Sequence, residues 1–71
     1  MPQYFFHVKR GQVTVLDQEG IELANSAQAE EEAGLRAQWC LADDAWNGRP
    51  VSRGMIIVAD ESWRRLFELP F

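Results

Sequence analysis

Cysteine and histidine are almost missing from this chain, which has one of each among its 71 residues. A single cysteine, Cys40, excludes an intramolecular disulfide and a cysteine-based zinc site, and one imidazole leaves most metal centres short of ligands. We therefore expect no metal site and no cofactor. No apolar run approaches the roughly 20 residues of a membrane span, and residues 1–4 lack the basic start of a signal peptide. The expected location is the cytoplasm.

Positive charge is also scarce. Seven basic and eleven acidic residues give a formal net charge of −4, which disfavours a nucleic-acid binder that works through a general basic surface. Hydrophobic residues make up 46% of the chain, too many for a disordered protein. The length leaves room for one core, so residues 1–71 are expected to form a single small domain. A core of this size supplies roughly 3–5 kcal/mol, which makes oligomerisation a natural supplement.

The first part of the chain has the pattern of a β-hairpin. Residues 4–9 are aromatic and β-branched, residues 10–12 contain a glycine and predict a turn, and residues 13–16 alternate in polarity. A polar turn over residues 17–20 then leads to a short extended segment at residues 21–23.

The spacing of apolar residues then changes to that of a helix. Asn25 or Ser26 is suited to cap its N-terminus, and Gln28 lies where a capping box requires a glutamine. The helix is expected to run to about Asn47, with Gly48 after its C-terminus.

The C-terminal part returns to strand. Residues 55–59 are an apolar run of strand length, residues 60–62 predict a turn, and residues 66–69 predict a last strand. The order ββαββ predicts an α+β fold, a two-layer sandwich in which one long helix covers one face of a four-stranded, mainly antiparallel sheet. The expected core consists of apolar residues from these elements: Tyr4, Phe6, Val8, Val13, Val15, Ile21, Leu23, Ala33, Ala37, Leu41, Ile57, Phe67 and Leu69.

Four short motifs resemble a known family. They are Met1-Pro2-x-Tyr4-Phe5-Phe6-His7, Asp17-x-Glu19-Gly20-x-Glu22-Leu23, Asp60-Glu61-Ser62 and Leu69-Pro70-Phe71. Together they are similar to an uncharacterised family of short proteins, a domain of unknown function common in rhizobia and related alphaproteobacteria. The resemblance implies a cytoplasmic bacterial protein and brings no activity or catalytic residue with it. The family usually has glycine after the Asp-Glu-Ser motif, whereas this chain has Trp63, which puts the tight glycine turn in question.

Two alternatives would give the chain a chemical function. Removal of Met1 would leave Pro2 as a secondary amine able to act as a general base, and residues 2–7 resemble the first strand of small tautomerases of the 4-oxalocrotonate type. In those enzymes a helix soon follows, whereas a hairpin is predicted here. The second alternative is a small nucleic-acid-binding regulator that uses arginines: Arg49, Arg53, Arg64 and Arg65. The main expectation is an interaction or structural module without catalysis of its own.

The predicted helix carries two apolar stripes when it is projected at about 100° per residue. One stripe consists of small residues with a cysteine and a leucine, Ala29, Ala33, Ala37, Cys40 and Leu41, and the other of Leu35, Trp39, Ala42 and Trp46. A helix on one sheet needs a single stripe, so we expect the small residues to face the sheet and the tryptophans to form an interface. In the alternative, the helix is rotated and the tryptophans wrap into the edge of the core.

The length of the predicted helix also favours an interface at the tryptophans. A helix of about 22 residues is roughly 33 Å long, whereas strands of this length span about 17–20 Å, so the end with Trp39 and Trp46 should overhang the sheet. Phe5 and His7, on the face of the first strand away from the core, are further interface candidates. The expected partner is a second copy in a homodimer, with an unidentified protein as the alternative; membrane and nucleic acid are not expected.

Overall fold

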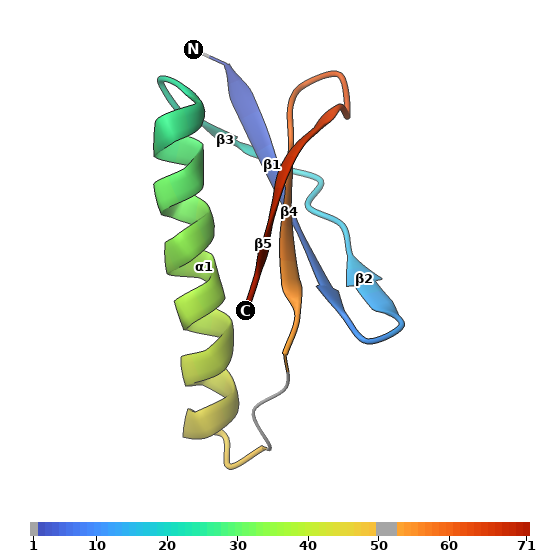
Figure 1. Cartoon of the computed structure of the whole chain (residues 1–71), viewed down its shortest axis with the longest axis vertical. Coiled ribbons are helices and arrows are strands. Elements are labelled where there is room, and N and C mark those ends of the chain that lie inside the picture. The colour runs from blue at the N-terminus through green and yellow to red at the C-terminus, as the bar shows by residue number, and fades with distance from the viewer. Residues whose placement is uncertain (1, 50–52) are drawn as a thin grey trace.

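The computed structural model describes residues 2–49 and 53–71, in which one long helix packs against a mainly antiparallel sheet (Figure 1). The elements are β1 (Gln3–Arg10), β2 (Val13–Val15), β3 (Ile21–Glu22), α1 (Ser26–Trp46), β4 (Met55–Ala59) and β5 (Arg65–Pro70). The order across the sheet is β2-β1-β4-β5, and β3 pairs with the first residues of β1. The predicted α+β fold and ββαββ order are confirmed, with the short extended segment forming β3.

The pairing of β1 with β4 decides which side chains face the helix. The register places Phe6 opposite Val58 and His7 opposite Ile57. Side chains that lie opposite each other point to the same face of a sheet, and the two faces alternate along each strand. The first pair therefore faces α1 and the second pair faces away from it.

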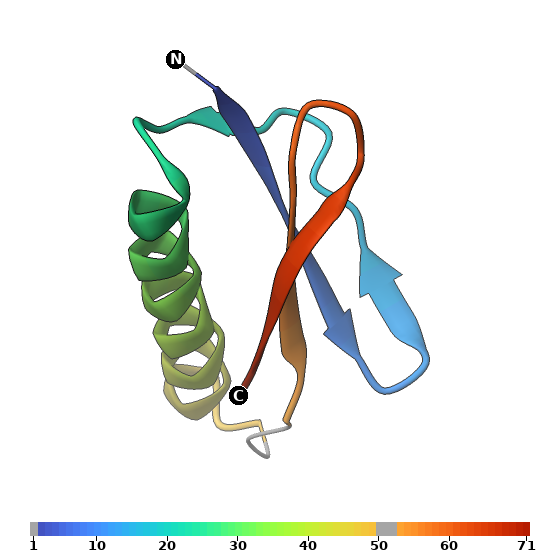
Figure 2. The ribbon, with the colours of Figure 1, turned by 45° about the horizontal axis from the view of Figure 1, so that its top comes forward.

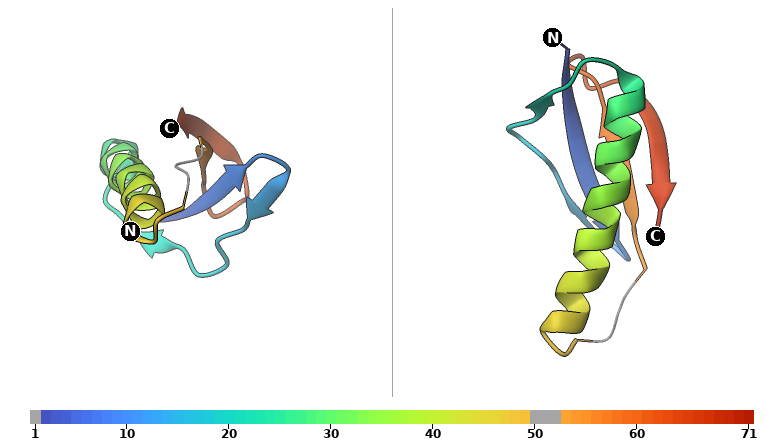
Figure 3. Two further views of the ribbon diagram at one scale, coloured as in Figure 1. Left: turned by 90° about the horizontal axis from the view of Figure 1, so that it is seen from below. Right: turned by 90° about the vertical axis from the view of Figure 1, so that its left-hand side faces the viewer.

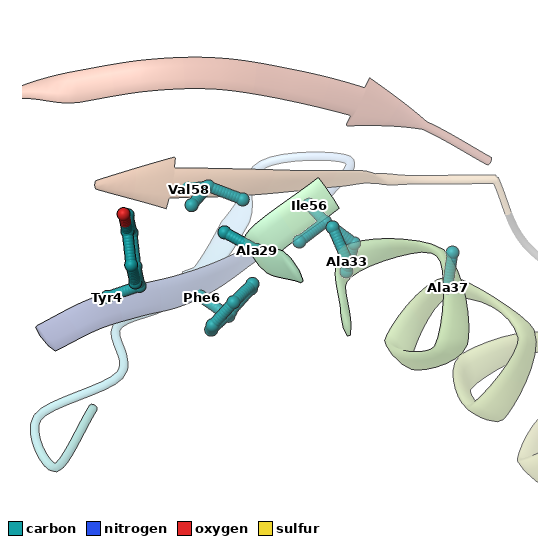
Figure 4. Close-up of a cluster of buried hydrophobic side chains, with 7 residues drawn as sticks. All are labelled: Tyr4, Phe6, Ala29, Ala33, Ala37, Ile56 and Val58. Atoms are coloured by element: carbon teal, nitrogen blue, oxygen red, sulfur yellow. The ribbon is translucent and has the colours of Figure 1, made fainter. Parts of the chain in front are cut away.

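The core lies between α1 and the two central strands (Figure 4). Its buried residues come from β1, α1 and β4: Tyr4, Phe6, Ala29, Ala33, Ala37, Ile56 and Val58. The helix contributes only alanines to this cluster, and their methyl groups let its backbone approach the sheet closely. Ile56 and Val58 are completely buried beneath it.

Both ends of α1 are capped as the sequence predicts. Asn25 Oδ1 accepts a hydrogen bond from the Gln28 N–H at 3.0 Å, and Gln28 Oε1 accepts one from the Ala24 N–H at 3.0 Å. At the other end Asn47 is the C-cap, and Gly48 has a φ of 70°, the left-handed conformation that favours glycine. No helix in the described ranges is both long and apolar enough to cross a membrane.

Three of the expected core positions, Val13, Val15 and Leu41, are wrong. Val13 and Val15 are 65% and 62% exposed, because β2 lies at the edge of the sheet, far from the helix (Figures 2 and 3). Ile57 is buried, but on the opposite face from the helix. Leu41 is only half-buried, because α1 extends past the sheet at this end.

A buried ion pair joins the last turns of α1 to the end of β1. The Arg10 guanidinium donates to both oxygens of Asp44, with Nη2–Oδ2 at 2.6 Å and Nη1–Oδ1 at 3.3 Å. Asp44 is almost fully buried, and Arg49 Nη2 lies 3.4 Å from its Oδ1. The Arg10 guanidinium also covers the ring of Phe71. These contacts connect three segments that are far apart in the chain.

One edge of β1 pairs with β3 near its start and with β2 near its end, and Asp17 bonds to the stretch between these two pairings. Its Oδ2 accepts a hydrogen bond from the Phe6 N–H, and its Oδ1 accepts from the N–H groups of Glu19 and Gly20, all at 3.1 Å. Burial by itself raises the pKa of Asp17, but these hydrogen bonds and the positive charge of Arg36 outweigh it. The pKa of Asp17 therefore lies below its usual value of 3.8.

Replacing Asp44 with alanine is expected to destabilise the fold by about 2–4 kcal/mol, because the change removes the buried carboxylate that accepts two hydrogen bonds from Arg10. Urea unfolding measures this loss as a change in the free energy of unfolding. The matched control is Asp43→Ala, which removes a carboxylate whose pair with Arg49 is exposed and should cost less than about 1 kcal/mol. Equal losses in the two variants contradict a special role for Asp44.

The lowered pKa of Asp17 predicts a loss of stability in acid. The folded state holds this carboxylate charged more strongly than the unfolded state does, so its contribution is complete above the unfolded pKa. It is lost as the pH falls through the lower pKa of the folded state. Urea unfolding from pH 6 down to the acid limit should therefore show a shallower pH dependence for Asp17→Asn than for the wild type.

Candidate functional site

The side of α1 that faces away from the sheet carries a row of exposed apolar side chains. Leu35 is 54% exposed, Trp39 77% and Trp46 90%. With Ala42 they follow one another at spacings of four, three and four residues, which places them on one stripe of the helix. We call this stripe, formed by Leu35, Trp39, Ala42 and Trp46, the tryptophan face.

The alanines on the opposite side of the helix explain why the tryptophans are outside. Ala29 and Ala33 are completely buried against the sheet and Ala37 nearly so. At 100° per residue the tryptophan face lies about half a turn of the helix away from them. The alternative of a rotated helix with its tryptophans at the edge of the core is therefore wrong.

The tryptophan face is not flat. Trp39 and Trp46 stand on either side of the small Ala42, and the space between them is a hollow of about 500 Å³, to whose lining Gln38 and Asp43 also contribute. Part of the face lies on the turns of α1 that extend past the end of β5, as the sequence predicted (Figure 3). Large rings flanking a small residue form a surface of knobs and holes.

The opposite face of the sheet holds a second group of aromatic side chains. Phe5 and His7 are 8% and 7% exposed, although α1 packs against the other face of the sheet. The indole of Trp63 covers both, with its ring centroid 4.9 Å from that of Phe5 and 5.6 Å from that of His7. The expectation that Phe5 and His7 present an interface needs correction, because Trp63 occupies most of the surface they would offer.

Trp63 reaches this position through an unusual backbone conformation. Its φ is 62°, the left-handed region that a glycine adopts without cost. Its N–H donates to the Asp60 carbonyl at 3.0 Å, and Asp60 Oδ1 accepts from the N–H groups of Ser62 and Arg64. The tight turn that the missing glycine put in question is therefore formed. Sequence analysis placed an aromatic ring near this hairpin tip but did not identify the rings that it covers.

His7 is held by one of its two ring nitrogens. Nδ1 accepts a hydrogen bond from the Asp17 N–H at 2.9 Å, so the proton of the neutral ring is on Nε2. The ring lines a hollow of about 310 Å³ on this face, together with side chains from β1, β2, β4, β5 and the last turn: Lys9, Thr14, Leu16, Met55, Ile57, Ala59, Trp63, Arg65 and Glu68. We call it the His7 hollow. No local sequence signal connects His7 with Asp17, because ten residues separate them.

The other candidates for chemistry are not assembled into a site. Pro2 is exposed, its carbonyl accepts a hydrogen bond from the Leu23 N–H at 3.1 Å, and it lines neither hollow. Met1 lies outside the described residues. Cys40 is half-buried. In the ranges that the structure describes, no three histidine, cysteine or acidic side chains gather in a group that could hold a metal ion.

The four arginines of the nucleic-acid alternative do not form one patch. Arg49 and Arg53 follow the C-terminal end of α1, whereas Arg64 and Arg65 lie at the turn between β4 and β5, at the other end of the molecule (Figure 1). Ion pairs with nearby carboxylates also reduce the positive charge of Arg49 and Arg65.

Comparison with known proteins places the chain in a family. No curated protein and no solved structure matches it. A family model described as a domain of unknown function, DUF6894, matches residues 3–71. This match includes every helix and strand described above, and the chain therefore belongs to the DUF6894 family.

Proposed function

We propose that this domain is a small interaction module that self-associates through the tryptophan face and has no catalysis of its own. The observation that carries the proposal is the exposure of Trp39 and Trp46, 77% and 90%, on the side of α1 away from the sheet. Exposed tryptophans are characteristic anchors of protein interfaces. The resemblance to a bacterial cytoplasmic family makes the cytoplasm the proposed location.

The shape of the face favours a second copy of the chain as the partner. Its 4-3-4 spacing is that of a coiled-coil seam, and it contains both knobs and a hole. In an antiparallel pair with a two-fold axis midway between Trp39 and Ala42, each Trp39 lies opposite the partner's Ala42. In the same register each Leu35 lies opposite the partner's Trp46. A surface that complements itself in this way is what a symmetric dimer requires.

Area and charge are consistent with this partner. Buried aromatic side chains contribute about 150–250 Å² each, so four tryptophans and two leucines bury roughly 1,000 Å² in the dimer, near the lower limit of specific interfaces. Arg36 and Asp43 lie along one flank of the face, seven residues apart. Antiparallel pairing brings each Arg36 close to the partner's Asp43, which places opposite charges at the rim.

Replacing Trp39 with glutamate is expected to weaken self-association by at least about thirtyfold, because a charge then has to be buried where an aromatic anchor was. The fold should stay intact, since Trp39 is exposed in the single chain. Sedimentation equilibrium measures the association and circular dichroism the fold. Ala45→Glu is the matched control, because Ala45 is also exposed on α1 but lies about a quarter of a turn away from the centre of the face. A wild-type monomer at high micromolar concentration, or a Trp39→Glu variant that unfolds, contradicts the proposal.

The register is tested by exchanging the knob and the hole. Ala42→Trp alone should weaken the dimer about tenfold, because it fills the position that the partner's Trp39 occupies. The double variant Trp39→Ala/Ala42→Trp should recover most of the affinity, since it restores one large and one small residue at each contact. The measurement is again sedimentation equilibrium. If the double variant is as weak as Ala42→Trp, the antiparallel register is wrong even where self-association holds.

A further inference from the structure

The His7 hollow has an apolar floor on the face of the sheet opposite α1. Ile57 and Ala59 of β4 form part of this floor and are buried within the single chain, and Met55 lies beside them. The volume of about 310 Å³ is at the small end of the range for ligand pockets, about 300–1,000 Å³. The hollow is on the opposite side of the sheet from α1, so it is separate from the tryptophan face.

The second ring nitrogen of His7 makes no hydrogen bond within the described part of the chain. His7 is 93% buried, and its Nδ1 is occupied by the Asp17 N–H, which leaves Nε2–H as a donor. Nε2 itself is not fully buried, so a ligand or solvent can reach it. An imidazole that lines a hollow, has Nδ1 occupied as an acceptor and carries one further N–H is suited to a ligand with an acceptor atom.

Charges on the wall of the hollow indicate which acceptor fits. Lys9 and Arg65 are positive and Glu68 is negative, and Arg65 is paired with Glu68 at 2.9 Å. The wall therefore carries one excess positive charge, on a chain whose net charge is −4. One negative charge near Lys9 and Nε2–H is the complementary arrangement.

Trp63 indicates what the rest of the ligand is like. One side of its indole is stacked on Phe5 and His7, yet the residue is still 58% exposed, so part of the ring remains at the rim of the hollow. Its positive φ is a strained conformation for a residue other than glycine. Such strained positions cluster at ligand-binding sites.

We propose that the His7 hollow binds a small monocarboxylate with a flat apolar body. The carboxylate accepts a hydrogen bond from Nε2–H of His7 and lies beside the ammonium of Lys9. The apolar body rests on the floor formed by Ile57 and Ala59 and contacts the edge of Trp63.

The test uses the fact that His7 is the only histidine in the chain, so its ring nitrogens give a single pair of NMR signals. The probe is 2-naphthoate, and 2-naphthamide has the same body without the charge. Titration with 2-naphthoate should shift the Nε2 signal to saturation, and 2-naphthamide should bind about tenfold more weakly, because the charged acceptor is lost. Equal binding of both compounds, or no saturable shift of the His7 signals, overturns the proposal.

Two variants locate the charge that is recognised. Lys9 is exposed, so Lys9→Gln should keep the fold and weaken 2-naphthoate binding about five- to tenfold. Arg49→Gln is the matched control, because it removes an exposed positive charge that follows α1 and does not line the hollow, and it should leave the affinity unchanged within about twofold. Equal weakening in both variants overturns the site, since it shows a response to net charge alone. Signals that shift only at the indoles of Trp39 and Trp46 also overturn it, because they place the compound on the tryptophan face.

Discussion

Close contact between the alanines of α1 and the sheet is the constraint on which the rest of the molecule depends. Ala29 and Ala33 lose all of their exposure in this contact, and the side chains of Ile56 and Val58 fill the space beneath them. A larger side chain at either alanine would push the helix away and open cavities in a core that has little area to spare. Because small residues occupy the sheet side of the helix, its large apolar residues are left on the outer side. The tryptophan face is thus a direct consequence of how the core is built.

Polar contacts between residues that are distant in the chain fix the ends of the helix and of the sheet relative to each other. The pair between Arg10 and Asp44 attaches the last turns of α1 to β1, close to Trp46, so the overhanging part of the helix has a fixed position. Asp17 performs a comparable role at the opposite edge, where its carboxylate and N–H satisfy Phe6 and His7. Both acidic side chains are bound to groups that are distant in the chain, and both position residues of the proposed surfaces.

The two faces of the sheet are covered by different parts of the chain, and β1 contributes side chains to both. On the helix side its aromatic residues enter the core, whereas on the other side Phe5 and His7 lie beneath Trp63. A turn with a tryptophan in place of glycine accepts backbone strain, and its indole covers that second face. The proposed dimer contact lies on the helix side and the His7 hollow on the other, so the two proposed sites do not overlap.

The sequence alone determined the features that depend on neighbouring residues: the caps at Asn25 and Gly48, the β1–β2 hairpin, and the two stripes of α1. Each depends on local hydrogen bonds or on the helical period, which can be read within a few residues. Tertiary structure alone decided the rest. Residues 55–59 are apolar throughout, so only pairing with β1 could show that Ile57 faces away from the helix. Val13 has the sequence pattern of a core residue, but it is exposed because β2 lies at the edge of the sheet. The order of the strands depends on contacts between segments that are distant in the chain, so the local pattern could not show it.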